Sequence, residues 1–104
     1  MILEVAVLNI RAGKADEFEK AFSEAGIIIS SAKGYQWHQL QKCIEKPLQY
    51  LLLVQWNTLQ DHTEGFRQSP EYLKWKELLH HFYDPFPKVE HYRMSASPEF
   101  GNQV

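Results

Sequence analysis

The chain has 104 residues, with 11 Lys and Arg against 13 Asp and Glu, and its formal net charge is −2. Because the chain has no basic stripe, this charge argues against nucleic acid and anionic membranes as general partners. Its one cysteine, Cys43, excludes an internal disulfide, and no apolar run approaches the about 20 residues of a membrane-spanning helix. The amino-terminal MILEVAVLNI alternates like a strand rather than a signal peptide, so we expect a soluble, cytoplasmic protein of one domain.

The first part of the chain predicts a strand, a helix and a second strand. Residues 2–10 are rich in Val, Ile and Leu, as in a buried strand. Between Gly13 and Gly34, apolar side chains recur at steps of three and four, which is typical of one face of an α-helix. These side chains are Ala15, Phe18, Phe22, Ala25 and Ile29. Residues 35–43 predict a strand that is more polar than the first.

Two further strands complete the predicted sheet. Residues 48–56 contain the run YLLLVQW, and the turn Glu45-Lys46-Pro47 joins them to the preceding strand as a hairpin. Residues 88–94 form a last, polar strand. The tail, residues 96–104, has few side chains to bury, so we expect it to be flexible or packed on a partner subunit.

Between these strands the pattern predicts two short helical segments. Thr58 can cap the first, with Asp61 three residues later, and Ser69-Pro70 supplies the N-cap and first residue of the second. Aromatic and histidine side chains along both segments would form a pocket wall over the sheet. These are His62, Phe66, Tyr72, Trp75 and His80. The stripe that contains Tyr72, Trp75 and Leu79 has the spacing of a core face as well.

The order β-α-β-β-α-β predicts an α+β fold, a ferredoxin-like sandwich with a four-stranded antiparallel sheet, over residues 1–95. In this topology the strands at 2–10 and 48–56 are central, and both are apolar on both faces. Helices cover only one face, so the other apolar face needs a cover. We expect a homodimer in which two sheets pack face to face.

The succession YLLLVQW, a polar turn, FRQSPEYLKWKELLHHF and PFPKVEHY resembles the antibiotic biosynthesis monooxygenase (ABM) family, over about residues 2–94. Members of that family are dimeric α+β barrels. They include oxygenases that oxidise phenols or quinols without metal or flavin, haem-degrading enzymes, and small proteins with no assigned reaction. The resemblance implies that no cofactor is needed and that molecular oxygen is the co-substrate.

Family residues carry over only in part. Polyketide-oxidising members place an Asn, a Trp and a Tyr at positions that match His62, Phe66 and Tyr72 here, so only the tyrosine is retained. His62 could act as base or donor, since an unperturbed histidine has a pKa of about 6.5. Haem-degrading members place an Asn, a Trp and an iron-ligating His where this chain has Ala6, Phe66 and Lys76. These departures disfavour haem, unless His80, one turn further on, serves as the ligand.

The resulting hypothesis is a cofactor-independent monooxygenase that oxidises a small aromatic, phenolic or quinol substrate in a cleft between helices and sheet. A non-catalytic ligand-binding or stress-related dimer, or a haem-binding or haem-degrading protein, are the alternatives. His62, Tyr72 and His80 are the candidate catalytic residues, and no metal ligands are expected. The candidate substrate contacts are Trp37, Phe66, Trp75 and Leu79. Trp37 and His38 lie on opposite faces of a strand, and the sequence leaves open which of them faces the cleft.

Overall fold

The computed structural model describes residues 1–96, and most of the predicted tail, residues 97–104, lies outside the described part. The elements follow the predicted order, with one short helical turn added before the last strand. They are β1 (Ile2–Asn9), α1 (Ala15–Ser30), β2 (Tyr35–Lys42), β3 (Gln49–Trp56), η1 (Asp61–Phe66), α2 (Pro70–Leu79), η2 (His80–Phe82) and β4 (Val89–Tyr92). The last strand is shorter than predicted.

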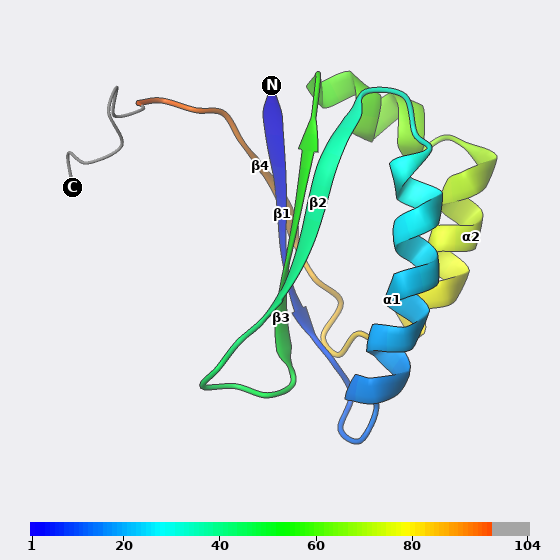
Figure 1. Cartoon of the computed structure of the whole chain (residues 1–104), viewed down its shortest axis with the longest axis vertical. Helices are drawn as coiled ribbons and strands as arrows, with labels where there is room; N and C mark the ends of the chain where they lie inside the picture. Colours follow the sequence, from blue (N-terminus) through cyan, green and yellow to red (C-terminus); the bar gives the residue numbers. More distant parts are fainter. Residues whose placement is uncertain (97–104) are drawn as a thin grey trace.

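The four strands form one antiparallel sheet in the order β2-β3-β1-β4. The first and third strands are therefore central, as predicted, and α1 and α2 lie together on one face of the sheet (Figure 1). This face is called the inner face below. Glu4, Ala6 and Leu8 of β1 point toward it, and their partners on β3 are Val54, Leu52 and Tyr50.

The core lies between the inner face and the helices. Four members of the predicted stripe of α1, Phe18, Phe22, Ala25 and Ile29, are buried, and the fifth, Ala15 at the start of the helix, is half-buried. Phe18 packs edge-on against the ring of Tyr50 at a centroid distance of 5.0 Å. No helix of the described residues is long and apolar enough to cross a membrane.

Two side-chain caps fix the helical starts between β3 and α2. The Thr58 hydroxyl accepts a hydrogen bond from the Asp61 amide at 3.1 Å, and the Ser69 hydroxyl accepts one from the Tyr72 amide at 3.2 Å. The first helical segment is a π-helix rather than an α-helix, since the Arg67 amide bonds to the His62 carbonyl at 3.0 Å, five residues back. This wider turn places Arg67 one turn after His62.

The opposite, outer face of the sheet carries apolar side chains that no described residue covers. Along β1 this face presents Leu3, Val5 and Val7, and Leu51 and Leu53 of β3 lie opposite the last two in register. Val7 is 43% exposed in the middle of its strand. The fold therefore has one face closed by helices and one apolar face left open.

Candidate functional site

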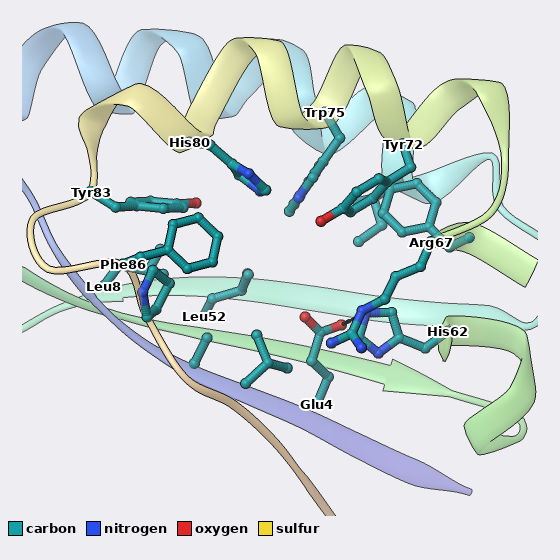
Figure 2. Close-up of a pocket in the computed structure, with 15 residues that line it drawn as sticks. Glu4, Leu8, Leu52, His62, Arg67, Tyr72, Trp75, His80, Tyr83 and Phe86 are labelled. Atoms are coloured by element: carbon teal, nitrogen blue, oxygen red, sulfur yellow. Dashed lines mark ion pairs between the residues drawn. The ribbon is translucent and has the colours of Figure 1, made fainter. Parts of the chain in front are cut away.

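A cavity of about 380 Å³ lies between the inner face of the sheet and α2 (Figure 2). Its floor comes from β1 and β3, its roof from α2, and its two ends from η1 and from the segment that follows η2. Most of its lining is apolar or aromatic, with four acidic or basic side chains among them. The acidic and basic side chains are Glu4, His62, Arg67 and His80, and the others include Ala6, Leu8, Leu52, Phe66, Tyr72, Trp75, Tyr83 and Phe86.

Glu4 is the one charged residue of β1, and its carboxyl group is buried at one end of the cavity. Its Oε1 accepts a hydrogen bond from the indole Nε1 of Trp56 at 3.0 Å and lies 3.3 Å from Nε2 of His62. Burial raises the pKa of this carboxyl group from 4.5 to about 7, although the Trp56 hydrogen bond and the charge of Arg67 act in the other direction. Near neutral pH the group can therefore both accept and release a proton.

His62 is buried beside Glu4 and is held in place on three sides. Its ring stacks on Trp56 at a centroid distance of 5.1 Å and an interplanar angle of 12°. Its Nδ1 lies 2.8 Å from Nε2 of His91 on β4. Burial above all, together with the charges of Arg67 and His91, lowers the pKa of His62 to about 3. The ring is therefore neutral near pH 7, so its 3.3 Å contact with Glu4 Oε1 is not an ion pair at that pH.

Arg67 brings a positive charge to the same end of the cavity. The π-turn directs its side chain back along His62 toward the carboxyl group of Glu4 (Figure 2). The guanidinium is close enough to lower the pKa of Glu4, His62 and His91, yet it forms no ion pair with any carboxylate of the described residues. It is therefore free to meet an anionic group of a ligand.

The middle of the roof is aromatic. Phe66 packs edge-on against Tyr72 at 5.5 Å and against Trp75 at 5.7 Å. Figure 2 shows the hydroxyl group of Tyr72 pointing into the cavity. These rings offer an apolar slot for a flat molecule, with one hydrogen-bonding hydroxyl beside it.

The far end of the cavity is formed by His80, Tyr83 and Phe86. The rings of His80 and Phe86 pack edge-on at 4.9 Å. Burial raises the pKa of the Tyr83 phenol, and Glu4 and Tyr72 raise it further, so this phenol remains a hydrogen-bond donor. Burial and the charge of Lys76 lower the pKa of His80, which favours a neutral ring.

The structure brings together five of the seven residues predicted for the site. His62, Phe66, Tyr72, Trp75 and His80 line this one cavity.

Trp37 and Leu79 lie elsewhere. Trp37 does not line the cleft, because a register shift between Tyr35 and Trp37 pairs it with Gln55 on the outer face. Its neighbour His38 faces inward, against Phe22. Leu79 is fully buried in the core and does not reach the cavity.

Sequence reasoning missed four polar residues of the site: Glu4, Arg67, Tyr83 and His91. One signal was present, because Glu4 is the single charge in an otherwise apolar strand. Arg67 had no such signal, since its position depends on a π-turn that the sequence pattern does not distinguish from an α-helix. His91 lies directly opposite Glu4 in the β1–β4 register, which the sequence does not specify.

The α+β fold, with a cavity between its helices and its sheet, is shared with a known protein family. The family model described as antibiotic biosynthesis monooxygenase matches residues 1–78, and the chain belongs to this family. Membership supports a monooxygenase function at the level of the family. The uncharacterized protein YczJ of Bacillus subtilis is 58% identical over 93 residues, which are 89% of this chain and 98% of that protein.

Solved structures show the same fold. A Bordetella bronchiseptica protein, named provisionally as an antibiotic biosynthesis monooxygenase, is 29% identical with a TM-score of 0.86, over 91% of this chain and 97% of that chain. SnoaB from Streptomyces nogalater, described as a cofactor-independent oxygenase, is 17% identical with a TM-score of 0.78, over 94% of this chain and 96% of that chain.

The raised pKa of Glu4 predicts a specific effect of pH on stability. The pKa of Glu4 in the folded state, about 7, exceeds the ordinary 4.5. The contribution of Glu4 to the stability of the folded state is therefore fully present below pH 4.5 and is lost as the pH rises through 7. Relative to that of the wild type, the free energy of unfolding of Glu4→Gln should therefore rise by about 3 kcal/mol between pH 4.5 and pH 7. Urea unfolding of both proteins across this range measures the difference.

The exposed Glu90 provides a matched control, and Glu90→Gln should show no such gain. His62 acts in the opposite sense, since its pKa is lowered and its contribution is lost as the pH falls from 6.5 toward 3. Because His62 is present in all three proteins, the comparison isolates Glu4. Parallel curves for wild type and Glu4→Gln would show that the carboxyl group is not perturbed by burial.

Proposed function

We propose that the protein is a cofactor-independent monooxygenase that oxidises a small aromatic phenol or quinol with molecular oxygen. The observation that carries this proposal is the buried carboxyl group of Glu4, which has a pKa of about 7 and faces an aromatic-lined cavity. A general base works best when its pKa lies near the working pH, and Glu4 meets this condition where His62, with a pKa of about 3, does not.

The cavity suggests how such a substrate would bind. Its rings would lie in the apolar slot beneath Phe66 and Trp75, with an acidic hydroxyl or CH group directed at Glu4. Arg67, which has no carboxylate partner among the described residues, would stabilise the anion that forms. Tyr72 and Tyr83 can donate hydrogen bonds to carbonyl oxygens of the substrate. The site therefore fits an electron-rich, polycyclic or quinol-like molecule.

The chemistry needs only the substrate and oxygen. Glu4 takes a proton from the substrate, and the electron pair of the broken bond remains on the aromatic anion. This anion is the reductant, and oxygen is reduced. When a ring CH₂ group becomes a carbonyl, one oxygen atom enters the product and the other leaves as water with the two hydrogens of that group. SnoaB, which shares the fold, is described as a cofactor-independent oxygenase, and this supports a route without a bound redox group.

The test is oxygen consumption with a panel of hydroquinones and anthrone-like phenols. We expect turnover to rise with pH through about 7, as Glu4 ionises, and to fall by about 100-fold or more in Glu4→Gln, the scale of a lost general base. Glu90→Gln, on the same sheet but exposed, should retain activity.

Two results would contradict the proposal. Binding of these aromatics without consumption above the spontaneous rate would favour a non-catalytic ligand-binding protein. A Soret shift on parallel titration with haem, lost in His80→Ala, would favour haem binding.

We also propose that the chain forms a homodimer through the outer face of the sheet. Leu3, Val5, Val7, Leu51 and Leu53 form a contiguous apolar surface there, and an exposed surface of this kind is an aggregation hazard in a monomer. A second copy of the same face is a self-complementary cover.

Sedimentation at micromolar concentration tests the dimer. Val7→Lys places a charge at the centre of the proposed interface and should give a folded monomer. Ile27→Lys places the same charge on α1, where the side chain is 74% exposed, and should leave the dimer intact. A monomeric wild type, or a dimeric Val7→Lys, would rule out this interface.

A further inference from the structure

Three ionisable side chains form a continuous chain from the cavity to the edge of the sheet. Glu4 Oε1 lies 3.3 Å from His62 Nε2, and His62 Nδ1 lies 2.8 Å from His91 Nε2. Glu4 faces the cavity, His62 is buried, and His91 is half-buried on the edge strand β4. Both nitrogens of the middle ring are thus used, one toward each neighbour.

We propose that His62 and His91 are a proton relay that connects Glu4 with solvent at the β4 edge. The inference rests on the proposed role of Glu4 as the base. A substrate that fills the cavity separates the carboxyl group from water on that side. The relay would let Glu4 exchange its proton through the wall of the cavity instead.

The path is balanced at each atom. The Glu4 O–H proton moves to His62 Nε2, the His62 Nδ1–H proton moves to His91 Nε2, and the His91 Nδ1–H proton leaves to water. One proton has then left the cavity and Glu4 is ionised. The reverse hops bring a proton in. Each passage leaves both rings in the opposite tautomer, and ring turning or exchange with water restores them.

The surroundings favour passage of a proton over its storage on a ring. Arg67 faces Glu4, His62 and His91 and disfavours a second proton on either imidazole. Glu4 in turn helps to raise the pKa of Tyr83, which remains a neutral phenol. The stacking of His62 on Trp56 fixes the plane of the ring, with Nε2 toward Glu4 and Nδ1 toward His91. His62 is therefore positioned to pass a proton from one neighbour to the other rather than to hold it as a base.

The relay predicts a spectroscopic signature in the free protein. Nitrogen-15 spectra of the histidine side chains report which ring nitrogen carries the proton. As the pH falls through the titration of Glu4, His62 should change from the Nε2–H to the Nδ1–H tautomer while remaining neutral, and His91 should change with it. In Glu4→Gln both rings should keep one tautomer throughout. A wild-type His62 that keeps a single tautomer, or that becomes doubly protonated with Glu4, would overturn the relay.

Kinetics supply the second test. His91→Gln should slow turnover by at least about tenfold, and added imidazole should restore it, because a small base replaces the missing ring at the surface. His81→Gln, at an exposed histidine outside the cavity, is the matched control and should be unaffected. Unchanged turnover in His91→Gln, or a loss that imidazole does not rescue, would contradict proton transfer through His91.

The two proposals fail separately. A tautomer switch in a protein that consumes no substrate would refute the oxygenase and leave the relay in place. Turnover with a fixed His62 tautomer would refute the relay and leave the oxygenase.

Discussion

The buried carboxyl group of Glu4 is the constraint around which the site is arranged. Removing a carboxylate from water costs several kcal/mol unless other groups compensate, and here compensation is partial. Trp56 donates one hydrogen bond and His62 Nε2 lies 3.3 Å away, while the positive charge of Arg67 acts from the same end of the cavity. The uncompensated part of this free-energy cost raises the pKa of the carboxyl group. Glu4 can therefore act as a proton acceptor near neutral pH.

The surrounding structure follows from the same constraint. The π-turn of η1 brings His62 and Arg67 to one end of the cavity, and the β1–β4 register places His91 opposite Glu4. The aromatic roof lies on α2. The Ser69-Pro70 cap fixes where this helix starts, and with it the positions of Tyr72 and Trp75. The sheet thus supplies the acid–base groups, and the helix supplies the apolar walls.

Much of the fold could be predicted from patterns of short range. The stripe of α1, the hairpin of β2 and β3, the caps at Thr58 and Ser69, and the central positions of β1 and β3 all depend on local periodicity or on a common topology. These features agree with the structure because local chemistry and packing favour the same arrangement.

The site was less predictable because it depends on register and on one irregular turn. Trp37 is a predicted substrate contact, but the sequence leaves its side of the strand open, and the shift after Tyr35 places it on the outer face. Glu4 lies in a strand that the sequence predicts to be apolar, although a lone charge on a central strand is itself a signal. Which groups meet it could be known only from the pairing of β4 and from the i to i+5 bond at Arg67.

The most direct measurement is the pKa of Glu4 itself, followed by carbon-13 NMR of its side-chain carboxyl group, with Glu4→Gln used to assign the signal. We expect a midpoint of about 7, well above the ordinary 4.5. A midpoint near 4.5 would contradict it, because Glu4 would then be a weak base at neutral pH and the proposed proton transfer would lose its starting point.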